Sequence, residues 1–278
     1  MTQNPRADWS APLFVVSAGR SGSTLLTNIL NAHPDVAMTH ESYVFHACVI
    51  SHLLASSPCG VVTETREIRL MGMVPPDYIE SFAGLHKAAM LDLLKAFFLE
   101  NFPDKQFVRW GDKFRRPECV AELIETFPRA SFLHVVRDGR DRTVSARKFL
   151  GRERDRIGPE VQEGTFEDHC NYWVDLNQGT ADALADHPSA MFVRYEDLIA
   201  DPHAEAARVL AFLGLEHHPH IDHFLDGPSR TVQRGHGTSE NASASRGRWR
   251  EELTDEEKAT ADRIMGETLD HFGYTQSR

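Results

Sequence analysis

Short runs of apolar residues alternate with longer amphipathic segments along the chain. Three runs have the composition of buried strands, at residues 13–16 (LFVV), 131–136 (SFLHVV) and 190–194 (AMFVR), and we expect a further short strand at 106–110. The segments between them are long enough for helices that return the chain to the same edge of a sheet. This alternation predicts an α/β fold with a central, mainly parallel sheet.

Capping residues and prolines mark the ends of the expected helices. Thr165 with Asp168, and Thr254 with Glu257, have the spacing of capping boxes, and Pro117 is suited to the first turn of a helix. Residues 151–164 and 226–245 are predicted to be loops. Helices are expected at 23–31, 43–57, 77–101, 117–127 and 139–150, from 165 onward, in two short pieces after 194 separated at Asp201-Pro202, and from 254 to about 273.

The charge of the chain limits its partners. Its 278 residues carry 30 Lys and Arg against 41 Asp and Glu, a formal net charge of −11. A protein this acidic is not expected to bind nucleic acid through its overall field. An anionic ligand therefore requires a local basic pocket. We expect the whole length, 1–278, to form a single domain.

The chain lacks the patterns of a membrane or secreted protein. No apolar run approaches the roughly 20 residues that span a bilayer, and the polar start MTQNPRADWSAP has no apolar core of a signal peptide. The four cysteines lie far apart and form no CxxC pair. We therefore expect a cytoplasmic protein with no stable membrane insertion and no metal site.

A glycine-containing segment, SAGRSGSTLL, joins the first strand to the first helix. Its first six residues, 17–22, are called the glycine loop below. Amides in such a loop, together with the helix N-terminus, are suited to an oxyanion. The alternative is a tight turn with an N-cap serine. Unlike the Walker pattern GxxxxGK[ST], the segment has no lysine, which favours a phosphate-like anion over a magnesium nucleotide.

A second strand, turn and helix occur in FLHVVRDGRDRTVS. Arg137 ends the strand, where open α/β sheets bind ligands, and Ser145 lies in the following helix. A guanidinium and a hydroxyl together suit a phosphate monoester. The alternative is a charged helix start with ordinary surface arginines, and we interpret Arg142 as facing solvent.

Together these segments resemble a known family. The run RSGSTLL, then NAHPDV, then Glu41 resembles the sulfotransferases that use 3′-phosphoadenosine 5′-phosphosulfate (PAPS), and is most similar to tyrosylprotein sulfotransferases and their bacterial relatives. The resemblance implies a three-layer fold like that of P-loop NTPases. It also implies that the 5′-phosphosulfate is bound by Arg20, Ser21, Gly22, Ser23 and Thr24.

The same family is matched by two further segments. VRDGRDxxxS resembles its 3′-phosphate segment, which implicates Arg137 and Ser145. VRYEDL resembles an element whose tyrosine lies near the nucleotide, here Tyr195. The family resemblance thus implies PAPS as sulfuryl donor and 3′-phosphoadenosine 5′-phosphate (PAP) as product.

The implied reaction needs a base and cations. Glu41 matches the position of the family base, with the neighbouring His40 as the alternative, since its ordinary pKa of ~6.5 suits the role. Lys113 in WGDKF resembles the lysine of a GDKxP element that contacts the sulfate, and Arg20 is the second cation. We expect in-line transfer to a hydroxyl without a metal.

The C-terminal part is less constrained. RGRW at 246–249 resembles the family's basic-tryptophan element, which implicates Arg248 and Trp249, within a flexible lid at 226–248 or a plain connector. Residues 58–105 and 151–188 match nothing in the family and are expected to build the acceptor pocket.

Several questions stay open from the sequence. The acceptor is a small molecule, a saccharide or a peptide with a hydroxyl group, and a homodimer is left open. Two other functions compete with sulfuryl transfer. One is a magnesium-dependent small-molecule or nucleotide kinase, against which the missing Walker lysine argues. The other is a catalytically inactive nucleotide-binding module, against which the presence of both Glu41 and Lys113 argues.

Overall fold

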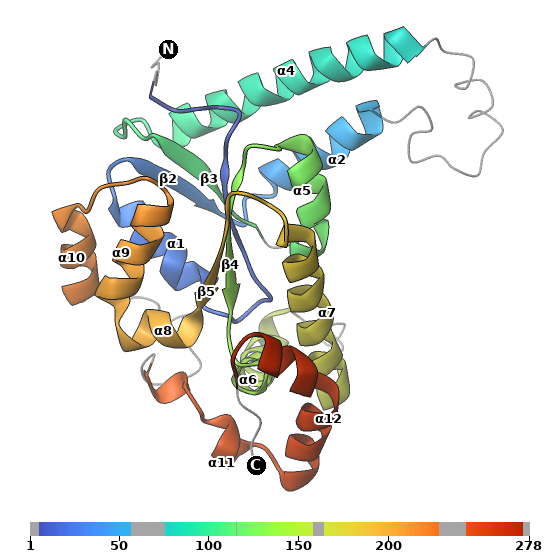
Figure 1. Ribbon diagram of the computed structural model, residues 1–278, viewed down its shortest axis with the longest axis vertical. Coiled ribbons are helices and arrows are strands. Elements are labelled where there is room, and N and C mark those ends of the chain that lie inside the picture. The colour runs from blue at the N-terminus through green and yellow to red at the C-terminus, as the bar shows by residue number, and fades with distance from the viewer. Residues whose placement is uncertain (1–5, 57–75, 115, 158–163, 228–242, 275–278) are drawn as a thin grey trace.

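A five-stranded parallel sheet lies at the centre of the computed structural model, which describes residues 6–56, 76–114, 116–157, 164–227 and 243–274 (Figure 1). The expected α/β class is therefore confirmed. The strands run in the order β2-β3-β1-β4-β5. Their bounds are β1 Leu13–Val16, β2 Val36–His40, β3 Arg109–Phe114, β4 Ser131–Val136 and β5 Ala190–Arg194.

Helices cover both faces of the sheet, giving three layers (Figure 1). One face packs against α1 (Ser23–Ala32), α8 (Tyr195–Ala200), α9 (Pro202–Phe212) and α10 (Pro219–Asp226). The other packs against α2 (Val44–Ser56), α4 (Pro76–Asn101) and α5 (Val120–Thr126). The remaining helices are α6 (Gly139–Ile157), α7 (Phe166–Leu184), α11 (Trp249–Glu252) and α12 (Asp255–His271), with short 3-10 turns at Pro117–Cys119 and Ser243–Ser245.

Both faces of β1 are buried, which explains why its sequence is apolar without alternation. Leu13 and Val15 belong to the core under α1. Phe14 belongs to the opposite, aromatic core, where its ring lies 5.0 Å from that of Phe45. None of the described helices combines the length and the low polarity that a membrane crossing requires.

Both capping boxes are confirmed, at the starts of α7 and α12. Four other expectations need correction. β2 was not expected, and β3 covers 109–114 instead of 106–110, because glycine and aspartate in WGDKF are poor strand formers that pairing on both sides overrides. α6 continues to Ile157 through charged residues expected to form a loop, and α10 was not expected.

The strand order places the two candidate anion segments next to each other. From β1 the chain moves toward β2 at one edge, whereas from β4 it moves toward β5 at the other. β1 and β4 are paired neighbours, so the connections at their carboxyl ends diverge. Such a switch point is where open parallel sheets leave a crevice for ligands. The glycine loop follows β1, and Arg137 follows β4.

Gly111 is required where β3 passes β1. A Cβ atom built on Gly111 would lie 1.7 Å from the backbone oxygen of Leu13, which is opposite it in the register. The Cβ atom is fixed to the backbone of β3, and the oxygen it would meet belongs to the backbone of β1, so neither can move without shifting a strand. We therefore expect Gly111→Ala to lower the free energy of unfolding by about 3 kcal/mol or more, measured by chemical denaturation.

The matched control is Gly179→Ala in α7, where a Cβ atom would meet nothing within 4 Å. This variant should be more stable by about 0.5–1 kcal/mol, since alanine favours the helix. Equal effects of the two substitutions would contradict the described packing of β3 against β1.

Candidate functional site

The glycine loop has an unusual backbone. Arg20 has φ 75° and Gly22, the N-cap of α1, has φ 93°. A positive φ is uncommon for a residue with a side chain, and such residues cluster at functional sites. The hydroxyl of Ser17 donates to that of Ser23 across the loop at 2.9 Å. Ser21 is fully buried, and its Oγ has no hydrogen-bond partner in the part of the chain described here.

Tyr195 lies against the glycine loop. A Cβ atom on Gly22 would come within 2.2 Å of Cδ2 of the Tyr195 ring, so only glycine fits there. The same ring lies 4.8 Å from the guanidinium of Arg137, and the Tyr195 hydroxyl is 2.9 Å from Oγ of Ser245. Tyr195 therefore connects the glycine loop, the end of β4 and the C-terminal segment.

Arg137, between β4 and α6, and Arg142, near the start of α6, hold the glycine loop directly. Nε of Arg142 donates to the carbonyl of Gly19 at 2.9 Å, and Nη1 of Arg137 donates to the carbonyl of Arg20 at 3.4 Å. In return, Nε of Arg20 approaches Oγ of Ser145 at 3.5 Å. The structure thus brings together the two segments that the sequence singled out separately.

Contrary to the expectation from the sequence, Arg142 does not face solvent. It is 6% exposed because the ring of Tyr172 covers its guanidinium at 4.7 Å. Burial lowers the pKa of Arg142 to about 10. Burial, followed by the nearby charge of Arg137, also lowers the pKa of Arg248. These three arginines concentrate positive charge inside an acidic protein.

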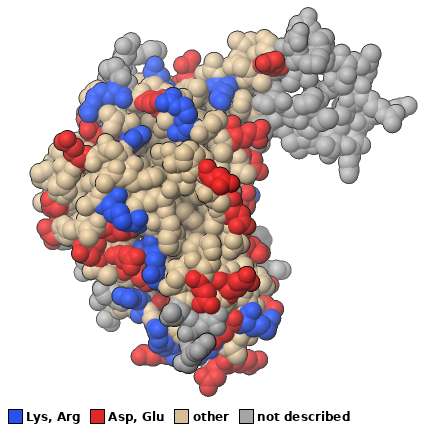
Figure 2. Space-filling model, viewed as in Figure 1, with Lys and Arg blue, Asp and Glu red and all other residues tan. Residues whose placement is uncertain are grey.

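Acidic and basic side chains are interspersed over the face of the molecule shown in Figure 2. The arginines that hold the glycine loop are instead buried, with Arg137 at 4% exposure. Within the described residues, Nε of Arg137 and Nη1 of Arg142 have no hydrogen-bond partner. Buried donors of this kind call for an acceptor, and the phosphate oxygens of a nucleotide fit that requirement.

Glu41, Lys113 and Thr24 meet at the ends of β2, β3 and the start of α1. Nζ of Lys113 is 2.6 Å from Oε1 of Glu41 and donates to Oγ1 of Thr24 at 3.0 Å. The backbone N–H of Glu41 also donates to the carbonyl of Lys113 at 3.1 Å. The candidate base, the candidate cation and the end of the glycine segment are therefore in contact. His40, the alternative base, is exposed at the end of β2.

Glu41 sits in a turn with unusual backbone geometry that Asp112 holds. Glu41 has φ 50° and Tyr43 has φ 57°. Oδ1 of Asp112 accepts from Oγ1 of Thr39 at 2.5 Å and from the N–H of Ser42 at 3.4 Å, on either side of Glu41. Sequence reasoning missed Asp112. The available clue was its place beside Lys113, in a segment that lies beyond the strand expected at 106–110 and belongs to β3.

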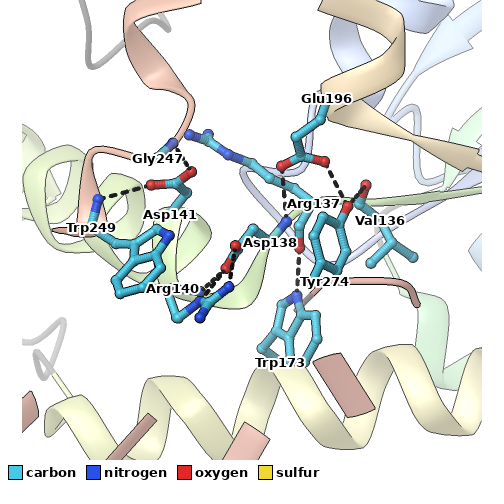
Figure 3. Close-up of polar contacts among 10 residues, drawn as sticks. All are labelled: Val136, Arg137, Asp138, Arg140, Asp141, Trp173, Glu196, Gly247, Trp249 and Tyr274. Atoms are coloured by element: carbon cyan, nitrogen blue, oxygen red, sulfur yellow. Dashed lines mark hydrogen bonds and ion pairs between the residues drawn. The ribbon is translucent and has the colours of Figure 1, made fainter. Parts of the chain in front are cut away.

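The C-terminal segment closes on the start of α6 (Figure 3). Asp141 accepts from the backbone N–H groups of Gly247 at 2.5 Å and Trp249 at 3.0 Å. The Trp249 ring is 2% exposed and carries the guanidinium of Arg140 at 3.9 Å, so a nucleotide base would have to displace that side chain to stack there.

Ser245 is a further residue that the sequence did not assign. Its carbonyl accepts from Nη2 of Arg137 at 2.5 Å, in addition to the contact of its hydroxyl with Tyr195. The irregular spacing of the preceding loop hid it. Residues 228–242 of the expected lid, and 58–75 and 158–163 of the expected acceptor segments, lie outside the described residues.

A polar cavity of about 140 Å³ borders Asp138 and the first turn of α6. Arg20, Glu41 and Lys113 are not among the described residues that border it. Its lining includes Asp138, Arg140, Asp141, Arg194, Glu196 and Tyr274.

Comparison with known proteins gives a consistent result. A sequence model described as the sulfotransferase family matches residues 12–219, which is more than half of the chain. A protein-tyrosine sulfotransferase of Drosophila melanogaster is 24% identical over 230 residues, covering 78% of this chain and 41% of that protein. An omega-hydroxy-beta-dihydromenaquinone-9 sulfotransferase of Mycobacterium bovis is 29% identical over 164 residues, covering 56% and 38%.

Carbohydrate sulfotransferase 4 of Mus musculus is 28% identical over 167 residues, covering 52% of this chain and 42% of that protein. The chain thus spans less than half the length of these three relatives. Among solved structures, the sulfotransferase domain of the Synechococcus PCC 7002 olefin synthase has a TM-score of 0.56 at 18% identity, covering 94% and 98%. A mouse sulfotransferase complexed with PAP has a TM-score of 0.57 at 14% identity, covering 96% and 87%. These structures share the fold.

Asp112 makes the stability of the protein depend on pH. Burial raises the pKa of Asp112 to about 6, from an ordinary value of 3.8. Between about pH 4 and 6 the folded chain therefore holds a proton that the unfolded chain has lost, and the free energy of unfolding falls as the pH rises through this window. Above about pH 6, the ionised carboxylate of Asp112 lowers the free energy of unfolding by on the order of 3 kcal/mol.

Asp112→Asn removes that titration while keeping an acceptor for Thr39. We expect the variant to match the wild type near pH 4 and to exceed it by about 2–3 kcal/mol near pH 7, measured by urea unfolding across this range. Unfolding free energies that differ by a constant amount at every pH would show that Asp112 does not titrate in this window.

Proposed function

The chain belongs to the sulfotransferase family, and from this premise we propose that it moves a sulfuryl group from PAPS to the hydroxyl of an acceptor. One observation carries the proposal. The glycine loop is bonded to the end of β4 and to the start of α6 through Arg137, Arg142 and Arg20, so both ends of one nucleotide can be bound at the same place. A mouse sulfotransferase of the same fold was solved with PAP, which supports this donor.

The residues present fit such a donor. The glycine loop and the start of α1 would hold the 5′-phosphosulfate through Arg20, Ser21, Gly22, Ser23 and Thr24. Arg137 and Ser145 would hold the 3′-phosphate, with Tyr195 and Arg248 beside them. The buried donors of Ser21 and Arg137 that have no partner in the described chain are the observation that supports this fit.

The residues around Glu41 supply the chemistry of transfer. When bound, PAPS supplies a sulfuryl group on a leaving group, PAP. Glu41 accepts the proton of the acceptor hydroxyl as the acceptor oxygen bonds to sulfur and the bond to the leaving phosphate breaks. Lys113, which contacts both Glu41 and Thr24, places a positive charge between the base and the glycine loop, where negative charge develops.

The acceptor is proposed only as a class. The relatives are named for protein tyrosine, carbohydrate and an omega-hydroxylated menaquinone, and a hydroxyl group is common to these. We propose a hydroxyl-bearing small molecule, saccharide or peptide. Independence of metal and a cytoplasmic location stay predictions.

Glu41→Gln tests the reaction. Loss of the base should lower the rate of ³⁵S transfer from PAPS by about 10²–10⁴-fold, against a panel containing a phenol, a sugar and a tyrosine peptide. Binding of PAP, measured by calorimetry, should persist because Glu41 takes the proton and does not hold the nucleotide.

The control is Glu100→Gln at the exposed end of α4, which should behave as the wild type. Failure of the wild-type protein to bind PAP, or to transfer label to any of the three acceptors, would contradict the proposed function. Loss of PAP binding in Glu41→Gln would reassign Glu41 from catalysis to binding.

Arg137→Ala tests which end of the nucleotide lies at β4. The variant should bind PAP less tightly by about 1.5–3 kcal/mol, since a charge-assisted contact to the 3′-phosphate is lost. Adenosine 5′-monophosphate, which lacks that phosphate, should bind almost unchanged in the same calorimetric assay.

The exposed Arg129→Ala serves as the control for a change of net charge. Equal weakening of both nucleotides in Arg137→Ala would reject the assignment of Arg137 to the 3′-phosphate.

A further inference from the structure

Three side chains hold the backbone around Arg137, and each comes from a different part of the fold (Figure 3). The Tyr274 hydroxyl is 3.1 Å from the carbonyl of Val136, and Nε1 of Trp173 donates to the carbonyl of Arg137 at 3.0 Å. Oε1 of Glu196 accepts from the N–H of Asp138 at 3.1 Å. The carbonyl of Arg137 and the N–H of Asp138 are therefore both hydrogen-bonded, and the Tyr274 hydroxyl lies against the carbonyl of Val136.

Glu196 and Tyr274 also bond to each other. The Tyr274 hydroxyl donates to Oε2 of Glu196 at 2.6 Å, and each residue is 5% exposed. Burial raises the pKa of Tyr274 well above its ordinary value, so the hydroxyl keeps its hydrogen. A short bond from a hydroxyl to a buried carboxylate is among the stronger hydrogen bonds in proteins. Glu196 is thus one acceptor shared by Tyr274 and the Asp138 backbone.

Tyr274 lies just beyond the end of α12, the last helix of the described chain. α12 ends at His271, and Gly273, with φ 73°, turns the backbone so that the N–H of Tyr274 donates to the carbonyl of Leu269 at 2.7 Å. The tyrosine then reaches the carboxyl end of β4, 138 positions earlier in the sequence. The end of the last helix therefore contacts the end of β4, which Arg137 follows directly.

Neighbouring residues on α8 face different parts of the site. The Tyr195 ring contacts the Arg137 guanidinium and the glycine loop, whereas Glu196 contacts the Asp138 backbone. The Arg137 side chain itself reaches the carbonyls of Arg20 and Ser245. Glu196 and Tyr274 therefore hold the peptide groups beside Arg137 without contacting its guanidinium.

The polar cavity gives the turn room to move if these bonds are lost. Asp138, Glu196 and Tyr274 all border its volume of about 140 Å³. In a close-packed surrounding, the turn would be held by contact alone. Where the turn borders the cavity, its position depends on the hydrogen bonds that Glu196 and Trp173 make to its backbone.

We propose that Glu196 and Tyr274 are positioning residues that fix the Arg137–Asp138 peptide and thereby set the affinity for the 3′-phosphate of the nucleotide. This inference rests on the proposed function, in which Arg137 binds that phosphate. Glu196 and Tyr274 act through Arg137 and touch neither the glycine loop nor Glu41 in the described contacts.

Tyr274→Phe tests the proposal, since it removes one hydroxyl and keeps the ring. The Kd for PAP, measured by calorimetry, should rise about three- to tenfold, the range expected for one hydrogen bond. The Kd for adenosine 5′-monophosphate should change less than about twofold. In transfer assays the KM for PAPS should rise while kcat at saturating PAPS stays unchanged, because Glu41 and Lys113 are not affected. A purely structural role would weaken both nucleotides alike.

A double-mutant cycle with Arg137→Ala separates the positioning role of Tyr274 from the proposed role of Arg137 in binding the 3′-phosphate. If Tyr274 acts through Arg137, Tyr274→Phe should have almost no further effect on PAP binding in the Arg137→Ala background. Independent, multiplicative effects would overturn the positioning role while leaving the proposed function intact. If Arg137→Ala alone does not discriminate between PAP and the monophosphate, the proposed function of Arg137 fails, and this inference fails with it.

Two further variants test whether weaker binding of PAP could result from a general loss of stability. Glu196→Gln retains the shape but replaces one of the two accepting carboxylate oxygens with an NH2 donor, and should show the same selectivity for PAP. Leu225→Ala in α10 removes buried apolar contacts of a residue that makes none of the hydrogen bonds described for the turn, and should lower stability without changing the ratio of the two Kd values. A change of that ratio in Leu225→Ala, or no change in either Tyr274→Phe or Glu196→Gln, would overturn the proposal.

Discussion

The contacts of the glycine loop with Arg137, which follows β4, and with Arg142, near the start of α6, determine the rest of the site. Carbonyl groups of Gly19 and Arg20 accept from Arg142 and Arg137, and Arg20 in turn approaches Ser145. These bonds occur only because β1 and β4 are neighbours at the switch point of the sheet. They join two loops that are more than 110 residues apart in the sequence, and they bury cationic groups that an anionic ligand can neutralise.

The general fold could be predicted because its signals are local. Uninterrupted apolar runs identified β1, β4 and β5, and capping boxes identified the starts of α7 and α12. β2 and the true extent of β3 could not be predicted, since VAMTH and WGDKF are strands only through pairing with neighbours distant in sequence. The strand order, which positions the site, is also a non-local property.

Much of the candidate site followed from motifs, whereas its supporting residues did not. Recognisable segments contain Arg20, Arg137, Glu41 and Lys113. The structure brings these residues together at the carboxyl ends of the parallel strands. Asp112, Arg142, Ser245 and Tyr274 gain their importance from contacts with backbone groups elsewhere in the chain. A backbone partner leaves no trace in the sequence of the side chain that contacts it, which is why pattern reasoning treated Arg142 as a surface residue.

The account requires that one nucleotide engage both loops at the same time. Calorimetric titration with adenosine 3′,5′-bisphosphate, adenosine 5′-monophosphate and adenosine 3′-monophosphate measures this directly. A shared site predicts one bisphosphate per chain, bound at least about 100-fold more tightly than either monophosphate, because the second phosphate binds intramolecularly. A bisphosphate that binds no more tightly than the better monophosphate, or two monophosphates that bind together without competing, would contradict it.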